Sequence, residues 1–114
     1  MTPKVSIILA NYNEEKYIAE AIESVINQTY TNWELIIIDD ASTDRSQDII
    51  NSYKDSRIKT RFCKKNNHVA YASNLGIDMA IGEYIAKIDS DDVWEAEKLE
   101  KQVLFMEEHT EYGV

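Results

Sequence analysis

Glycine is scarce in this chain of 114 residues, and only Gly76, Gly82 and Gly113 occur. A dinucleotide-binding fingerprint of the form G-x-G-x-x-G, or a P-loop that cradles phosphates, needs closely spaced glycines after a strand. Neither pattern is present in the sequence. This scarcity argues against dinucleotide-dependent oxidoreductases and P-loop nucleotidases.

A second cysteine, long apolar runs and catalytic histidine patterns are also missing. Cys63 is the only cysteine, so no internal disulfide can form, and a reducing compartment fits. An apolar run such as residues 35–38 is far too short to span a membrane, and no signal peptide is recognisable. His68 and His109 stand outside any Ser-His-Asp or Cys-His pattern. We therefore expect a cytoplasmic protein with no membrane-spanning segment in this chain.

Basic residues are outnumbered by acidic ones, 12 against 21, which gives a net charge of -9. This balance argues against nucleic acid or an anionic membrane surface as a direct partner. An acidic protein that binds an anionic substrate needs a cation between the two. The length allows one domain at most, with 44% hydrophobic residues to form its core.

Strand-like and helix-like patterns alternate along the chain. Apolar, β-branched runs predict strands at residues 5–10, 34–39, 58–62 and 84–88. Apolar residues at helical spacing predict helices at 17–26, 44–53, 69–80 and 95–109, with Ser42, Thr43 and Asp44 as capping candidates for the second. The alternation predicts an α/β fold, a Rossmann-like and mostly parallel sheet with flanking helices.

Polar residues follow every predicted strand, and ligands of open α/β sheets bind beyond the carboxyl ends of the strands. These polar segments are residues 11–14, 39–42, 64–67 and 89–92. Each has a simpler explanation, since Asp39 and Asp40 could cap a helix and Asn66-Asn67 could form an ordinary turn. Their coincidence at one edge of the sheet favours a ligand site.

The fourth segment, Asp89-Ser90-Asp91-Asp92, holds the strongest chemical signal. In an extended backbone, residues two apart point to the same side, so Asp89 and Asp91 could converge on one ion. Carboxylate oxygens suit Mg²⁺ or Mn²⁺, and Mg²⁺ is usually held by one or two carboxylates plus substrate phosphates. The motif therefore predicts a divalent metal and a phosphate-bearing substrate.

Ordered sequence blocks resemble the glycosyltransferases of family 2. The blocks are residues 5–13 (VSIILANYN), 24–30 (SVINQTY), 33–44 (WELIIIDDASTD), 82–86 (GEYIA) and 89–92 (DSDD). A lone D-x-D motif is a weak signal, but these blocks occur in the family's order over nearly the whole chain. The resemblance implies the glycosyltransferase A fold, in which a nucleotide-binding α/β half is joined to a variable acceptor half.

The resemblance also implies roles for individual residues. Ala10 and Tyr12 would line the base and ribose pocket, and Asp40, with Asp39 beside it, would accept a hydrogen bond from the base edge. A metal ion, Mn²⁺ or Mg²⁺, would bind chiefly to Asp91. The remaining donor and metal contacts at the fourth strand would come from Asp89 and Ser90.

The implied activity is an inverting sugar transfer from a nucleotide-diphosphate sugar, UDP-linked by expectation, to a glycan or a lipid-linked acceptor. Residues 1–114 would form the donor-binding part, and the acceptor part and general base would lie beyond residue 114, so this fragment alone should turn over little. The last predicted helix runs into residues 111–114 without a closing strand. The resemblance suggests polysaccharide synthesis at the inner face of the cell membrane, peripheral membrane association of a longer protein, and self-association.

Two positions depart from the family pattern: Ser73 stands where an arginine is usual, and Ala10 stands where a Pro-Thr pair often leads into Tyr-Asn. Other interpretations are a degenerate, non-catalytic nucleotide-binding member or a phosphoacceptor receiver domain. A receiver needs paired acids after its first strand, where this chain has Asn11-Tyr12-Asn13. A sugar nucleotidyltransferase would need a glycine-rich loop there. Trp33 and Trp94 are expected to pack in the core or at its edge, and Trp94, which closely follows Asp92, is also a candidate for a wall of the donor site.

Overall fold

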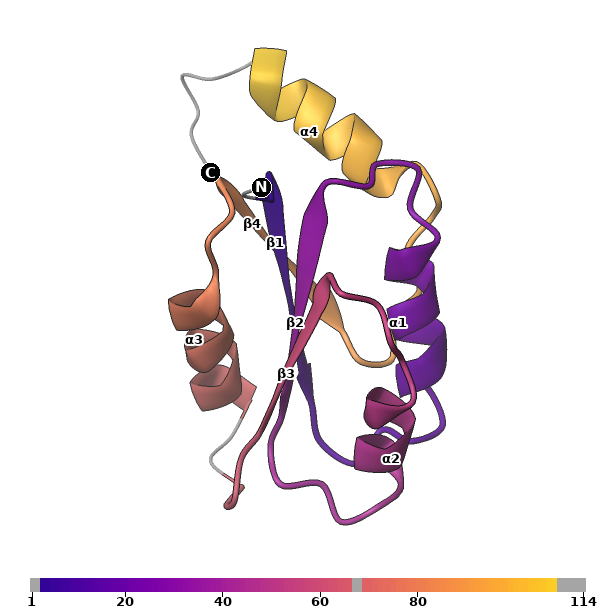
Figure 1. The fold of residues 1–114 in the computed structure, drawn as a ribbon, viewed down its shortest axis with the longest axis vertical. Coiled ribbons are helices and arrows are strands. Elements are labelled where there is room, and N and C mark those ends of the chain that lie inside the picture. The colour runs from indigo at the N-terminus through magenta and orange to yellow at the C-terminus, as the bar shows by residue number, and fades with distance from the viewer. Residues whose placement is uncertain (1–2, 67–68, 109–114) are drawn as a thin grey trace.

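The fold is a single four-stranded parallel sheet with helices on both faces (Figure 1). The computed structural model describes residues 3–66 and 69–108. Its strands are β1 (Val5–Asn11), β2 (Trp33–Asp39), β3 (Ile58–Phe62) and β4 (Tyr84–Asp89). Its helices are α1 (Ile18–Ile26), α2 (Ser46–Asn51), α3 (Val69–Met79) and α4 (Lys98–Glu108). The expected mostly parallel α/β architecture is confirmed.

The strand order is β3-β2-β1-β4. The chain adds β2 and then β3 on one side of β1, and afterwards returns to add β4 on the other side of β1. The helices α1 and α2 cover one face of the sheet, α3 covers the other, and α4 lies beyond the amino ends of the strands (Figure 1). The reversal of direction falls between β1 and β4. Ligands of doubly wound sheets bind at such a switch point, outside the carboxyl ends of the strands.

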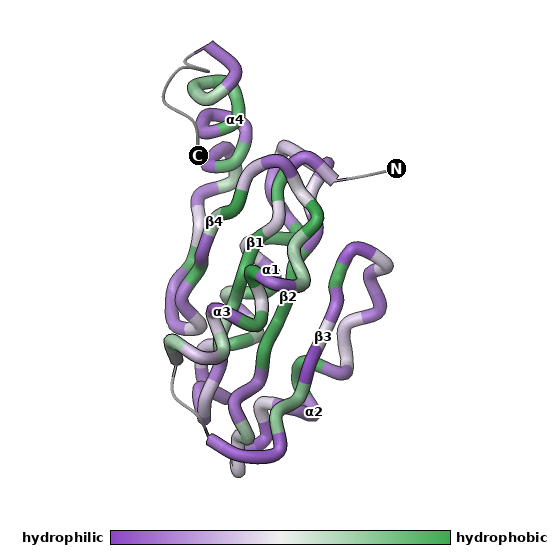
Figure 2. The backbone as a smooth tube through the Cα atoms, turned by 90° about the vertical axis from the view of Figure 1, so that its left-hand side faces the viewer, coloured by the Kyte–Doolittle hydropathy of each residue, from purple (hydrophilic) through white to green (hydrophobic). Residues whose placement is uncertain are grey.

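Both faces of the two central strands are buried, which explains their continuous apolar runs. Figure 2 shows the hydrophobic segments concentrated in β1 and β2. The core against α1 and α2 includes Ile7, Leu9, Ile22, Leu35 and Ile37, with Trp33 and Trp94 buried at its margin as expected. The core on the α3 side is built from Ile8, Ile36, Ile38 and Ala72.

Gly76 allows α3 to lie directly on β1. A Cβ atom at this position would lie 2.5 Å from Cγ2 of Ile8, closer than carbon atoms can approach. Gly82 makes a second close approach, because a Cβ there would lie 2.6 Å from Oγ of Ser6 and 2.8 Å from its backbone nitrogen. The second approach meets backbone, which cannot move aside as a side-chain end can.

A buried polar cluster joins three strands at the amino end of the sheet. The carboxylate of Glu34, which is 3% exposed, accepts hydrogen bonds from the hydroxyl of Ser6, from the Ile81 amide at 2.9 Å and from Nζ of Lys59 at 2.6 Å. Burial alone would raise the pKa of Glu34, but these hydrogen bonds outweigh it and lower the pKa below its ordinary value of 4.5. The Ser6 hydroxyl also accepts from the Gly82 amide at 2.8 Å.

The helix α4 is fastened to the end of α1 by Gln28. Its side-chain amide donates to the Glu95 carbonyl at 2.7 Å and accepts from the Leu99 amide at 3.0 Å. The expected helix at 95–109 thus begins later, at Lys98, and residue 109 lies outside the described residues. Within the described part of the chain, no helix has the length and apolar character needed to cross a membrane.

Candidate nucleotide-binding edge

Strand register brings the predicted site residues to one edge of the sheet. Asn11 pairs with Asp39 across β1 and β2, and Ala10 pairs with Asp89 across β1 and β4. Because the strands are parallel, the segments that follow them all leave the sheet at this end. The sequence-based prediction that these segments share an edge is confirmed. This edge includes the switch point between β1 and β4.

Asp39 is fully buried, and its carboxylate is held by other residues of the chain. Its carboxylate accepts four hydrogen bonds: from Nδ2 of Asn11 (2.9 Å), the Ser42 amide (2.9 Å), the Ser42 hydroxyl (2.6 Å) and Nε2 of Gln47 (2.9 Å). A carboxylate has about four lone-pair sites, and the chain itself fills them. This side chain ties β1, α2 and the loop after β2 together, and a ligand contact of Asp39 stays a prediction.

The loops after β1 and β2 are joined by a second set of hydrogen bonds, which we call the loop clasp: Asn13, Ser42, Thr43 and Asp44. Oδ1 of Asn13 accepts from the Thr43 amide at 2.7 Å and from the Asp44 amide at 3.2 Å. Nδ2 of Asn13 donates to Oγ1 of Thr43 at 3.3 Å, and the Asn13 amide donates to the Ser42 hydroxyl at 2.9 Å. Four hydrogen bonds of Asn13 thus join the two loops.

Asp44 extends the loop clasp in both directions. Its carboxylate accepts from the Glu15 amide at 3.0 Å and from the Ser46 amide at 2.9 Å. Burial alone would raise the pKa of Asp44, but hydrogen bonds from Ser46 and from the Glu15 amide lower it. The second bond links Asp44 to the first residue of α2, but the residue at the N-cap position is Arg45, which makes no side-chain capping hydrogen bond. The expectation that Ser42, Thr43 or Asp44 caps this helix is therefore wrong, because α2 begins two residues later than predicted.

Two residues of these loops have left-handed backbone conformations, Asn13 with φ 54° and Ala41 with φ 63°. Asparagine tolerates this region, whereas an alanine there costs about 1–2 kcal/mol. Such strain persists where surrounding contacts over-determine the backbone, and it is common at ligand sites. Ala41 directly follows Asp40. Its left-handed conformation therefore sets the course of the backbone next to the acid that is expected to contact a base.

The exposed side chains at this edge lie around the buried ones. Tyr12 is 40% exposed and Ala10 is half-buried. Asp40 is buried, and the Cys63 amide after β3 donates to the carbonyl of the preceding residue, Asp39, at 2.8 Å. Ser73, which takes the place of the family's usual arginine, is also buried. An aromatic ring, a small side chain and a carboxylate thus follow or end the strands at this edge.

The D-x-D segment forms a turn and does not continue the strand. The strand β4 ends at Asp89, and the Asp92 amide donates to the Asp89 carbonyl at 3.0 Å. The expectation that an extended backbone aims Asp89 and Asp91 to the same side is therefore wrong in its premise. Both aspartates and Asp92 are exposed, while Ser90 is buried at 9% exposure.

The turn nevertheless offers the donor atoms that a hard divalent cation prefers. Among residues 3–66 and 69–108, no group of three or more His, Cys, Asp or Glu side chains is arranged to hold a metal ion by itself. Mg²⁺ sites that depend on substrate phosphates need only one or two protein carboxylates. The exposed carboxylates of Asp89 and Asp91 fit a metal of this kind, held jointly with a phosphate-bearing ligand.

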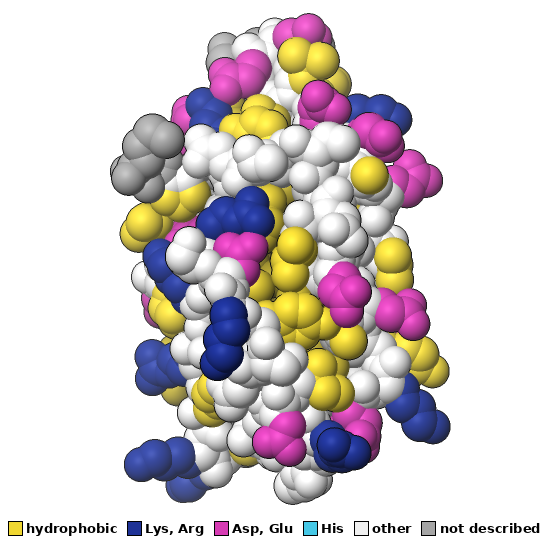
Figure 3. Space-filling model, turned by 45° about the vertical axis from the view of Figure 1, so that its right-hand side comes forward, with side chains coloured by type: hydrophobic (Ala, Val, Ile, Leu, Met, Phe, Trp, Pro, Cys, Tyr) yellow, Lys and Arg dark blue, Asp and Glu magenta, His cyan; other side chains and the backbone are white. Residues whose placement is uncertain are grey.

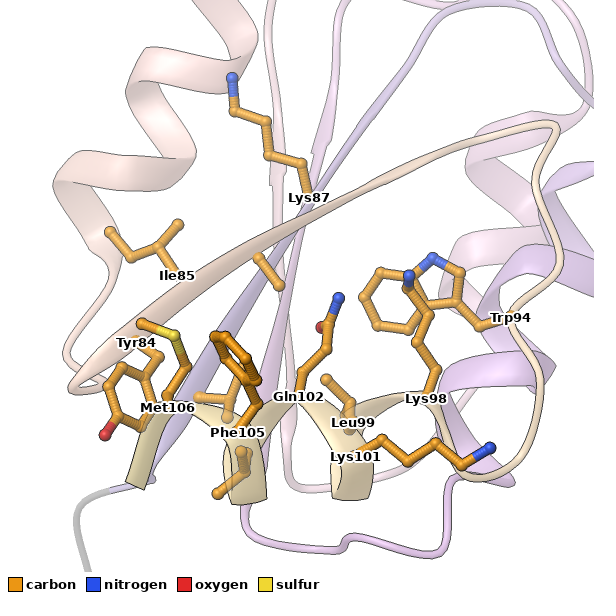
Figure 4. Close-up of a pocket in the computed structure, with 13 residues that line it drawn as sticks. Tyr84, Ile85, Lys87, Trp94, Lys98, Leu99, Lys101, Gln102, Phe105 and Met106 are labelled. Carbon is orange, nitrogen blue, oxygen red and sulfur yellow. The ribbon is translucent and has the colours of Figure 1, made fainter. Parts of the chain in front are cut away.

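A separate groove of about 530 Å³ lies between the outer edge of β4 and α4 (Figure 4). Ile85, Leu99, Phe105 and Met106 are among its apolar lining residues, and Lys87, Lys98 and Lys101 also line it. The groove contains none of the residues at the carboxyl edge described above. On the face in Figure 3, most basic side chains lie toward the left, acidic ones are more frequent toward the right and the top, and both kinds occur at the bottom.

Sequence reasoning missed Gln47 as a member of the site's supporting structure. Gln47 reaches Asp39 from α2, a contact between residues eight apart. The available signal was a polar residue in the first turn of the helix that follows the doubled acid Asp39-Asp40. Asn13 and Ser42 stood within the recognised blocks, but nothing in the sequence revealed that they bond to each other.

Comparison with known proteins places this arrangement among sugar-transferring enzymes. The profile of the family described as "Glycosyl transferase family 2" matches residues 6–114. The Escherichia coli protein WfaP, named as a UDP-Glc:alpha-D-GlcNAc-diphosphoundecaprenol beta-1,3-glucosyltransferase, is 50% identical over 106 residues. That match covers 90% of this chain and 41% of WfaP.

Solved structures of sugar-transferring enzymes have a fold similar to that of this chain. Residues 1–349 of S. aureus TarS, determined in complex with UDP, match with a TM-score of 0.88 and 32% identity, over 94% of this chain and 33% of that one. The mannosyltransferase PcManGT from Pyrobaculum calidifontis, determined with GDP-Man and Mn²⁺, matches with a TM-score of 0.83 and 26% identity, over 93% of this chain and 33% of that one. The chain thus spans well under half the length of these relatives.

Proposed function

The chain belongs to glycosyl transferase family 2, and from that premise we propose that it is the donor-binding part of an enzyme that transfers a sugar from a UDP-sugar. The observation that carries this proposal is the meeting of Ala10, Tyr12, Asp40 and the 89–92 turn at the carboxyl edge of β1, β2 and β4. The likeness to TarS, whose structure holds UDP, supports uridine as the base.

In this proposal the base lies against Tyr12 and next to Ala10, where a large side chain would block its entry. Asp40 accepts a hydrogen bond from an N–H of the base. Burial strengthens that contact, because a polar group in a low-dielectric site gains more from each hydrogen bond than it does in water. Ser73 leaves the donor without the arginine contact usual in the family, so the 89–92 turn has a larger share in holding the diphosphate.

Asp91 and Asp89 would hold a divalent metal at the diphosphate end of the donor, in keeping with the Mn²⁺ present in the PcManGT structure. The metal would supply positive charge that offsets the diphosphate and stabilises it as a leaving group. The carboxylates of the chain fix the position of that charge at the switch point. An inverting displacement then needs a general base and an acceptor hydroxyl, which we assign to the portion that this chain's relatives have in addition.

WfaP acts on a diphosphoundecaprenol-linked sugar, as its name states, and this favours a lipid-linked or glycan acceptor for the complete enzyme. A lipid-linked acceptor would place the enzyme at the inner face of the cell membrane. The direct test begins with the donor. UDP is titrated into the protein by calorimetry with and without Mn²⁺, using wild type, Asp91→Ala and the control Asp78→Ala.

Asp78 is exposed near the end of α3, toward the opposite end of the sheet, so its loss should leave binding unchanged. We expect Mn²⁺-dependent UDP binding in wild type and in Asp78→Ala, and none in Asp91→Ala. Binding that persists unchanged in EDTA would remove the metal from the proposal. Wild-type protein that binds no nucleotide under either condition would overturn the donor-binding assignment.

A further inference from the structure

The donor edge depends on the relative position of two loops that belong to different strands. Tyr12 follows β1 and Asp40 follows β2, and neither is part of a regular element. A base held between a ring and a carboxylate requires both to be fixed, since a misplacement of about 1 Å can cost a large factor in binding or rate. Some contact must therefore lock one loop to the other.

The Asp40 amide donates to the Asn11 carbonyl at 2.8 Å, and Asn13 makes the side-chain contacts that join the two loops beyond that point. Its side chain accepts from two successive amides of the second loop, donates to the Thr43 hydroxyl, and its own amide donates to Ser42. The residue adjoins Tyr12 and has a left-handed backbone, a conformation that an asparagine side chain supports at low cost. No described atom of Asn13 is needed for the core, because the residue is exposed.

We propose that Asn13 is a positioning residue that sets Tyr12 against Asp40 and so determines how strongly the site distinguishes one nucleotide base from another. This inference rests on the proposed donor site. Asn13 touches neither base nor phosphate; it acts through the loop clasp. Removal of its side chain should therefore weaken recognition of the base and leave the contribution of the diphosphate and metal in place.

Asn13→Gly tests this, because glycine keeps the left-handed backbone and deletes only the side chain. The dissociation constants of UDP and ADP are measured with Mn²⁺ for wild type, Asn13→Gly and the control Asn27→Gly. Asn27 is also exposed and follows α1, whose end lies at the opposite edge of the sheet. Hydrogen exchange of the Thr43 and Asp44 amides reports whether the loop clasp has opened.

We expect Asn13→Gly to bind UDP at least tenfold more weakly, with a fall in the ratio of the ADP constant to the UDP constant, while Asn27→Gly matches wild type. A purely structural role would raise both constants equally and leave the ratio unchanged, and that result overturns the proposal. A Thr43→Val variant, which removes one acceptor only, should shift the ratio in the same direction by a smaller factor and decides the matter if Asn13→Gly does not fold.

The binding measurements also distinguish failure of the donor-site proposal from failure of the positioning role of Asn13. A wild-type protein that binds neither nucleotide removes the donor site and this inference with it. A wild-type protein that binds UDP and ADP equally keeps the donor site and overturns the positioning role, because there is no base preference for Asn13 to set. Loss of amide protection at Thr43 and Asp44 with UDP affinity within threefold of wild type also overturns it.

Discussion

Replacement of Asp39 by asparagine should lower the free energy of unfolding of the protein, because Asp39 holds the carboxyl edge of the sheet together. The substitution keeps the shape of the side chain and exchanges one acceptor oxygen for an NH₂ group. Both carboxylate oxygens of Asp39 now face two donors each, Asn11 and Ser42 at Oδ1, Ser42 and Gln47 at Oδ2. Either orientation of the new amide therefore brings donor against donor in a buried site.

The magnitude follows from that geometry. Asn11 could turn its own amide and present Oδ1, which has no partner in the structure, to the new NH₂ group. That rotation still leaves at least one buried donor without an acceptor, at about 1–3 kcal/mol, and the bonds that remain lose their charge-assisted strength. We expect a total loss of about 2–4 kcal/mol, a large part of the roughly 5–15 kcal/mol that holds a typical domain together.

Urea unfolding of wild type, Asp39→Asn and the control Asp48→Asn measures this loss. Asp48 is an exposed acid on α2, and its substitution should change stability by no more than about 0.5 kcal/mol. The unfolding midpoint of Asp39→Asn should fall with an unchanged dependence on urea. An Asp39→Asn protein as stable as the control would refute the conclusion that Asp39 is a saturated structural acceptor.

Gly82→Ala should destabilise the protein by about 1–3 kcal/mol, since the new Cβ meets the backbone of Ser6 as well as its side chain. Gly76→Ala should cost less, because the atom it meets is a side-chain methyl of Ile8 that can shift, and reversal of this order in urea unfolding would contradict the packing described. The low pKa of Glu34 means that its ionised form stabilises the folded state; this contribution is present at pH 7 and is lost as pH falls below 4.5 toward the lowered pKa. The stability difference between wild type and Glu34→Gln should therefore shrink on acidification, and a difference that stays constant from pH 7 to pH 3 would exclude this linkage.

The elements of the fold were predictable from the sequence because each has a strong local signal. The β-branched runs at Val5 and Leu35 identified strands buried on both faces, and one-turn spacing of apolar residues identified α1. Strand order was not predictable, since each crossover could place the next strand on either side. The order depends on which faces of the helices fit the sheet, and Gly76 shows how closely that fit is made.

The position of the site at the edge of the sheet was predictable from the sequence, but the contacts among its side chains were less so. Doubled acids after β2 marked the edge, but nothing local distinguishes the buried structural acid, Asp39, from its neighbour Asp40. That distinction arises from Asn11 and Gln47, which approach from other elements. The D-x-D spacing suggested an extended segment, whereas a hydrogen bond between Asp92 and Asp89 turns the chain there. Turn formation of this kind depends on how the following segment leaves the sheet.

The polar cluster around Glu34 and the one around Asp39 stand at opposite ends of the same strand, five residues apart. At about 3.3 Å per residue, this separation is roughly 16 Å, beyond the range over which substitutions usually influence each other. The sheet is thus stabilised at each end by a separate cluster of polar side chains. An engineer could redesign the ligand edge to accept another nucleotide, offset the lost stability by improving the Glu34 end, and expect the two changes to add without interference.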